Sequence, residues 1–204
     1  RLLTAEPEAF PVIRDALVPH EMTLVNPMWG VWQDESNGPE KRFRAACALA
    51  QFAAMDHRWE RASGPVASLL VRQNSLVARH WIDALQPVRD ILVPVLIGIY
   101  ADEQRESAER SLAADVLSVY VKDDVDRLVF LTKSATPEQF KIVFPGLARH
   151  RTEAIAMLER DLTRPSGWND PPLSQRWKAV SQVEIDRLEN ALGMMRERFA
   201  CCAA

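Results

Sequence analysis

The chain has 204 residues, and 48% of them are hydrophobic, which is enough to form a core and excludes a disordered segment. The formal net charge of -3 and the isoelectric point near 5.9 give no overall attraction to a phosphate backbone, so we expect no nucleic-acid partner. The longest apolar run, residues 91–100, contains Pro94 and Gly98 and is far shorter than the roughly 20 residues that span a bilayer, so we expect no membrane insertion.

The two ends of the chain indicate a segment of a larger protein. The sequence begins at Arg1 without a methionine or a signal peptide, and helix-like sequence starts by Glu6. It ends at Ala204, directly after an amphipathic run. We therefore expect a soluble fragment, with the cytoplasm favoured as its location.

Hydrophobic residues recur with helical spacing along the chain, and no stretch alternates as a strand would, so the sequence predicts an all-α protein. Thr136 followed by Pro137 has the pattern of a helix start. Pro19, Pro87 and Pro145 are expected at breaks between paired helices. The helices, which would form about five antiparallel pairs, are predicted near residues 6–17, 20–34, 39–54, 58–73, 76–85, 88–101, 105–121, 123–132, 137–148 and 151–163.

Part of the sequence is duplicated, since residues 15–56 correspond to residues 83–124 at a shift of 68 positions. The correspondence needs no gap, and it joins identical residues at both ends and in the middle of the two windows. The identical pairs are Asp15/Asp83, Ala16/Ala84, Leu17/Leu85, Pro19/Pro87, Leu24/Leu92, Val25/Val93, Gly30/Gly98, Asp34/Asp102, Glu35/Glu103, Arg42/Arg110, Ala45/Ala113, Ala46/Ala114, Leu49/Leu117 and Asp56/Asp124.

A third and looser copy follows, in which Leu147, Arg151 and Leu158 match Leu85, Arg89 and Leu96 of the second copy. A unit of about 68 residues can hold two helical hairpins. Each hairpin is then near the lower end of the range of about 34–47 residues for helix-pair repeats. The sequence therefore predicts a HEAT-like α-solenoid of antiparallel helical hairpins over residues 1–163.

Two different segments are expected after the repeats. Residues 164–181 contain four helix breakers, Pro165, Gly167, Pro171 and Pro172, and two tryptophans, Trp168 and Trp177. We expect an ordered strap that buries both tryptophans, with a free linker as the alternative. Residues 182–204 contain a C-terminal amphipathic helix, predicted over residues 182–199, which would cap the stack or lead into the next domain.

The sequence contains no recognisable catalytic, cofactor-binding or metal-binding motif. Three cysteines without metal spacing indicate neither a disulfide framework nor a zinc site, and Cys47 is expected as a buried free thiol. The four histidines are scattered. Asp123, Asp124 and Asp126 lack the glycine and glutamate of a calcium loop and are expected to cap a helix.

A partner-binding surface is the remaining candidate site. Arg42, Arg44, Arg89, Arg105 and Arg110 could line one edge of the stack, where they would form salt bridges across repeat junctions or, alternatively, an acidic peptide groove. His80 and Trp81 form the most unusual polar-aromatic pair. The residues predicted to contact a protein or peptide partner are Arg42, Arg44, His80, Trp81, Arg89 and Arg110.

Several short sequence segments resemble the helical middle region of large planctomycete-type bacterial proteins. They lie at residues 10–17, 42–50, 81–89, 109–113, 138–145 and 185–201. In that family the region tends to lie between an N-terminal serine/threonine protein kinase domain and a C-terminal domain like the formylglycine-generating enzymes. The resemblance implies a scaffold or sensor segment whose partners include those flanking domains, and no catalytic residue of either enzyme has a match in this chain.

Three functions are compatible with these observations. The favoured one is a non-catalytic helical-repeat scaffold that binds a protein. The second is a purely structural spacer between enzymatic domains, and the third is an enzyme with an unrecognised site between helices. A pocket of titratable groups with perturbed pKa values would favour the enzyme, whereas a surface of exposed aromatic and arginine side chains would favour the scaffold.

Overall fold

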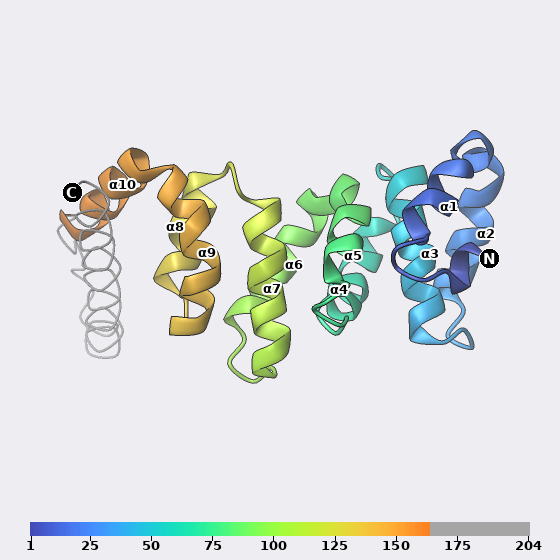
Figure 1. The fold of residues 1–204 in the computed structure, drawn as a ribbon, viewed down its shortest axis with the longest axis horizontal. Coiled ribbons are helices and arrows are strands. Elements are labelled where there is room, and N and C mark those ends of the chain that lie inside the picture. Colours follow the sequence, from blue (N-terminus) through green and yellow to red (C-terminus); the bar gives the residue numbers. More distant parts are fainter. Residues whose placement is uncertain (164–204) are drawn as a thin grey trace, which may run out of the picture. The chain divides into compact units, whose positions relative to one another are not determined.

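The structure, a computed structural model, describes residues 1–163, in which helices are joined by turns and loops and no strand occurs (Figure 1). The predicted all-α class is confirmed for this part of the chain. The α-helices are α1 Phe10–Ala16, α2 Glu21–Gln33, α3 Pro39–Phe52, α4 Trp59–Leu70, α5 Ala78–Ala84, α6 Arg89–Ala101, α7 Ser107–Tyr120, α8 Val125–Lys133, α9 Pro137–Arg149 and α10 Arg151–Thr163, and the 3-10 turns are η1 Leu2–Thr4, η2 Val18–His20 and η3 Gln86–Val88.

Each predicted helix has a counterpart, and the largest difference is at the N-terminus. The first helix is expected from residue 6, but α1 begins at Phe10, with Pro11 in its first turn. The preceding residues form η1, which the sequence analysis did not predict. Among residues 1–163, no helix is both long enough and apolar enough to cross a membrane.

The chain divides into two compact units, with the boundary inside α7 after Val116. In the first unit, α3 packs along α2 and also contacts α4 and α5, while α4 packs against α6 (Figure 1). In the second unit, α8 packs against α9 and α10.

The core of the first unit depends on small residues in α3 and large aromatic residues around it. The run from Ala45 to Ala50 is almost completely buried, so neighbouring helices can approach α3 closely. Trp81 of α5 lies edge-on to Phe10 and to Phe43, with ring centroids 5.2 and 5.5 Å apart. Such aromatic pairs stabilise a core beyond the area that they bury.

Cys47 lies within this small-residue run and is fully buried, as predicted. Burial raises the pKa of its thiol, because the thiolate would lose its solvation. Cys47 is therefore a small core residue and not a nucleophile.

The helix boundaries recur along the chain at the shift found in the sequence. Each of α5, η3, α6 and α7 begins and ends 68 positions after α1, η2, α2 and α3, respectively. We call α1–α3 the first triplet and α5–α7 the second triplet. The helices expected in both windows of the duplication are thus confirmed, and neither window contains a strand.

Two polar contacts recur at the same shift, and they explain why some identical residues are polar. The Nε of Arg42 donates to the carbonyl oxygen of Trp32 at 2.8 Å, and the Nε of Arg110 donates to that of Tyr100 at 3.3 Å. Each arginine thereby satisfies a carbonyl in the last turn of the preceding helix, where intrahelical partners are absent.

The aspartate after that helix makes the second recurring contact. Asp34 Oδ1 accepts the backbone N–H of Ser36 at 2.9 Å, and Asp102 Oδ1 accepts that of Gln104 at 3.0 Å. Such turns fix the chain direction between two helices. The two aspartates therefore belong to the turn between the helices.

Helix caps organise the second unit. Asp124 caps α8, since its carboxylate accepts the backbone N–H of Arg127, and this confirms the capping role predicted there. Thr136 and Gln139 form a reciprocal capping box at the start of α9, which confirms the predicted helix start.

The prediction for one proline is wrong. Pro19 and Pro87 lie in the 3-10 turns η2 and η3, as expected, whereas Pro145 lies inside α9. In the third copy, where Leu147 matches Leu85, the position of Pro87 is taken by Arg149. Arginine keeps its N–H and permits helical geometry, so α9 continues to Arg149, and His150 is its C-cap.

The predictions for residues 164–204 lie outside the described residues. They include the strap with Trp168 and Trp177, the helix over residues 182–199, and the cysteines Cys201 and Cys202.

Candidate functional site

The six residues predicted to contact a partner do not form one surface patch. Arg44 and Trp81 lie together, since the Arg44 guanidinium is 5.6 Å from the Trp81 ring centroid. Arg44 is also committed to structure, because it donates to the carbonyl of Ala5 at 2.9 Å and pairs with Glu40. Trp81 is 2% exposed, so its ring belongs to the core.

The other four predicted residues are placed separately. Arg42 and Arg110 support the ends of α2 and α6, as described above. Arg89, at the start of α6, lies 3.7 Å from the carboxylate of Asp90. Within residues 1–163, the buried Nδ1 of His80 and the buried Nε1 of the adjacent Trp81 have no hydrogen-bond partner.

Of the arginines considered for salt bridges, Arg44, Arg89 and Arg105 pair with carboxylates at most four positions away in the sequence. The Nη1 of Arg105 lies 2.9 Å from Glu109, whose carboxylate also pairs with Arg72 at 2.8 Å. Arg72 follows α4 and is not one of the arginines considered, so its contact with α7 does not test the prediction of salt bridges across repeat junctions. Both guanidinium groups lower the pKa of Glu109, with the Arg72 hydrogen bond as the largest contribution.

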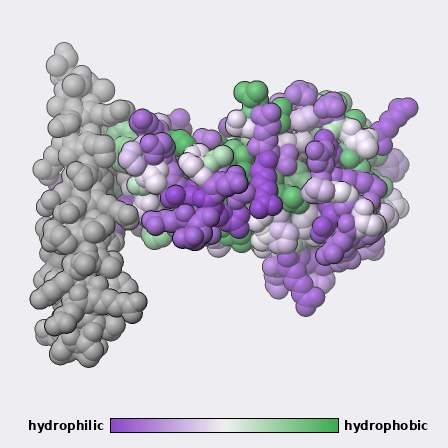
Figure 2. All heavy atoms as spheres, turned by 90° about the horizontal axis from the view of Figure 1, so that it is seen from below, coloured by the Kyte–Doolittle hydropathy of each residue, from purple (hydrophilic) through white to green (hydrophobic). Residues whose placement is uncertain are grey.

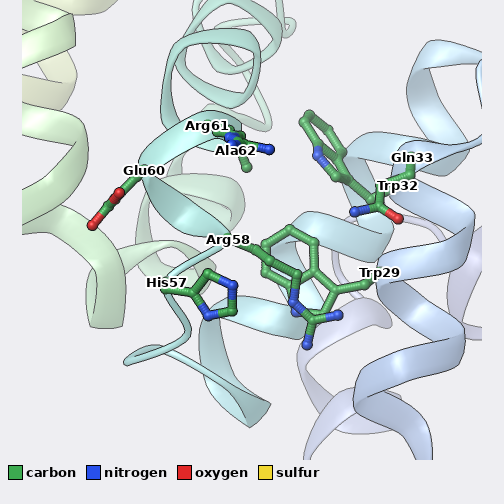
Figure 3. A pocket seen from close by; sticks show the side chains of 8 residues that line it. All are labelled: Trp29, Trp32, Gln33, His57, Arg58, Glu60, Arg61 and Ala62. Atoms are coloured by element: carbon green, nitrogen blue, oxygen red, sulfur yellow. The ribbon is translucent and has the colours of Figure 1, made fainter.

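A pocket of about 370 Å³ lies elsewhere in the first unit, between the end of α2 and the start of α4 (Figure 3). α2 contributes Trp29, Trp32 and Gln33. The turn before α4 and its first residues contribute the remaining lining residues, which are His57, Arg58, Glu60, Arg61 and Ala62. We call this cavity the α2–α4 pocket.

The floor of the α2–α4 pocket is held by a polar network around Asp56. Its carboxylate accepts the indole N–H of Trp29 at 3.1 Å and pairs with the Arg58 guanidinium at 2.6 Å. Arg58 also lies over the Trp29 ring, 4.8 Å from the centroid, and donates to Asn26. These contacts fix the rotamers of Trp29 and Arg58 before any ligand arrives.

The ionisation of Asp56 follows from this network. The hydrogen bonds from Arg58 lower the pKa of the Asp56 carboxyl to about 2. The carboxylate is therefore ionised and paired at neutral pH, whereas a general base needs a pKa near the working pH. This geometry suits a structural ion pair.

Two other side chains at the pocket can donate hydrogen bonds. The side chains of Arg61 and Gln33 make no hydrogen bond or ion pair with the described residues. In Figure 3 the Arg61 side chain lies on the wall formed by α4, and Gln33 and Trp32 lie opposite on α2. The carboxylate of Glu60 points away from the space between these walls. The pocket thus places two donors that have no partner among the described residues beside two tryptophans that are almost completely buried.

The sequence analysis missed this pocket because its residues are distant in the sequence. Trp29 and Asp56 are 27 positions apart, and no local motif joins them. The cluster of Asp56, His57, Arg58 and Trp59 is a signal that could have indicated it, since four large polar or aromatic residues in a turn between helices are unusual. Asp56 was noted only as an identical position of the duplication.

Among the described residues, no group of three or more His, Cys, Asp and Glu side chains is placed to hold a metal ion. Comparisons of the chain with protein-family models, with curated proteins and with solved structures returned no match.

Proposed function

We propose that this chain is a non-catalytic helical-repeat scaffold, of the HEAT-like α-solenoid kind, that binds a protein partner. The observation that carries the proposal is the recurrence, from the first triplet to the second, of helix boundaries together with the arginine-to-carbonyl contacts that close them. Stacked hairpins of this kind bury a continuous core and leave side chains from successive helices available for binding.

The α2–α4 pocket supports an interaction role over that of a spacer. Its tryptophans and arginines are the residue types enriched at the energetically important positions of protein interfaces. A spacer needs no preorganised cavity. The lowered pKa of Asp56 is explained by its ion pair with Arg58, so it is no argument for the enzyme alternative.

The parent protein is proposed from the resemblance alone. We propose that the segment belongs to a larger bacterial signalling protein that resembles serine/threonine kinases with a C-terminal domain like the formylglycine-generating enzymes. Its partners would then include those flanking domains, which it would hold apart while presenting its own surface. The catalytic residues of such domains are not found in this chain.

The test is an affinity capture from the native host, with the 204-residue chain as bait. A Leu49→Asp variant serves as the control, because a charge at this fully buried position disrupts the core. We expect one protein to be enriched by the folded bait alone and, once purified, to bind it saturably. If the folded and disrupted baits capture the same proteins, the scaffold proposal fails and the spacer alternative is favoured.

A further inference from the structure

We propose that the α2–α4 pocket receives a carboxylate side chain from an acidic segment of the partner protein. This inference deepens the proposed function and rests on it. It assigns a place and a ligand chemistry to the interaction, and the place differs from the six residues that the sequence analysis had favoured.

Donor chemistry is the first argument. Arg61 projects a guanidinium at one wall and Gln33 an amide at the other, and both lack a partner among the described residues. A guanidinium presents paired N–H donors that match the two oxygens of a carboxylate. An unused arginine beside an aromatic wall is therefore suited to a planar anion.

The charge around the pocket is the second argument. Asp56 is neutralised by Arg58 at 2.6 Å, so this pair contributes little net field. Arg61 has no ion-pair partner among the described residues, while the Glu60 carboxylate is turned away from the cavity (Figure 3). One available cation matches a monoanionic carboxylate better than a phosphate, which carries about -1.5 to -2.

The walls and the size of the pocket are the third argument. Trp29 and Trp32 line the pocket, although they are only 1% and 5% exposed, and cation–π contacts hold them to Arg58 and Arg42 at 4.8 and 5.1 Å. The small area that they expose can contact the methylene groups of a glutamate. A volume of about 370 Å³ is near the low end of the range of about 300–1,000 Å³ for ligand sites, which favours one or two side chains.

The surroundings also favour polar recognition. On the face drawn in Figure 2, hydrophilic residues predominate over the described part of the chain, and hydrophobic residues occur in separate groups. Met22 and Met55 are 87% and 97% exposed, and Met22 lies one and two turns before Asn26 and Trp29 on α2. A partner segment could thus pair its acidic residue with an apolar neighbour.

The experiment uses the indole N–H resonances of the full chain in a ¹H–¹⁵N spectrum, assigned by single Trp→Phe variants. The probe is an acetylated and amidated peptide that alternates glutamate and leucine, and matched peptides carry glutamine or phosphoserine in place of glutamate. We expect the glutamate peptide to shift the resonances of Trp29 and Trp32, with those of Trp59 and Trp81 unchanged. Arg61→Glu should weaken this binding at least tenfold.

Lys141→Glu is the matched control, because it makes the same charge change on the exposed surface of α9 and should leave binding unchanged. Equal shifts with the glutamine peptide, tighter binding of the phosphoserine peptide, no shift at all, or unchanged binding by Arg61→Glu would each overturn the inference. If any of these results appears while the affinity capture still yields a saturable partner, this inference fails and the scaffold proposal stands.

Discussion

The two helix triplets share a backbone plan, but they differ in what their middle helices do. α2 and α6 are each 13 residues long and end on an aspartate that bonds to a backbone N–H two residues later. α6 packs against α4 and buries several aliphatic side chains. α2 buries fewer residues and leaves part of its surface to the α2–α4 pocket.

The difference lies in side chains that the duplication does not preserve. Trp29 and Gln33 line the pocket, and the residues at the matching positions of the second triplet are Ile97 and Ala101. Asn26, which accepts from Arg58, is replaced by Pro94. Residues that close the hairpin are therefore identical, whereas residues that form the pocket are specific to one triplet.

The largest expected effect tests whether the cores of the two triplets are equivalent. Leu49 and Leu117 occupy matching positions, and both are completely buried. Leu→Ala at either position should lower the free energy of unfolding by about 2–5 kcal/mol, because it removes apolar contacts and leaves a cavity. Denaturant titration of both variants measures this. A loss below about 1 kcal/mol at one position alone would show that the two cores are not equivalent.

The next prediction concerns the contributions of Asp56 and its counterpart Asp124 to stability, which we expect to differ. The pKa of Asp56 is lowered to about 2, below its unfolded value near 3.8, so its ion pair stabilises the fold above pH 4 and is lost as the pH falls from about 4 to 2. Asp56→Asn should cost about 1–2 kcal/mol at pH 7, after allowance for solvent screening, and much less near pH 2. Thermal unfolding at several pH values gives the difference.

Asp124 provides the control for this prediction. Its carboxylate caps α8 and lies 3.4 Å from the exposed Arg127 guanidinium, a surface pair that contributes little. Asparagine caps a helix about as well as aspartate. Asp124→Asn should therefore change stability by no more than a few tenths of a kcal/mol at pH 7. Equal losses for the two variants would contradict the distinction between an ion-pair network and a simple cap.

A smaller effect concerns two buried tryptophans in α4 and α5, the helices that contact α3. Trp59 and Trp81 are both buried, but the indole N–H of Trp59 donates to Ala53 at 2.9 Å, whereas that of Trp81 has no acceptor among the residues that the structure describes. Trp→Phe removes a similar volume at each site, and only at Trp59 does it also remove a hydrogen bond. We expect Trp59→Phe to cost about 1 kcal/mol more than Trp81→Phe in chemical unfolding. If Trp81→Phe costs more than Trp59→Phe, the lost packing, and not the lost hydrogen bond, determines the loss of stability.

Helical spacing and helix starts were sufficient to predict the all-α class and the helices of the described residues, because these features depend on neighbours within a few turns. Thr136 predicted its helix start for this reason. Pro145 was misassigned, since a proline alone does not distinguish a break from a tolerated position inside a helix. The α2–α4 pocket was not predictable, because Trp29 and Asp56 meet only through the packing of distant helices.

The smallest effect is the most direct test of the shared backbone plan. Arg42 and Arg110 each donate to a carbonyl ten residues earlier, at the end of the preceding helix. Arg→Met at either position keeps much of the aliphatic packing and removes the donor, which should cost about 1 kcal/mol at each site. The two losses should agree within about 0.5 kcal/mol in parallel unfolding titrations. Arg42 also lies over Trp32, so a clearly larger loss at Arg42 would mean that this cation–π contact, and not the shared carbonyl bond, is what the arginine contributes.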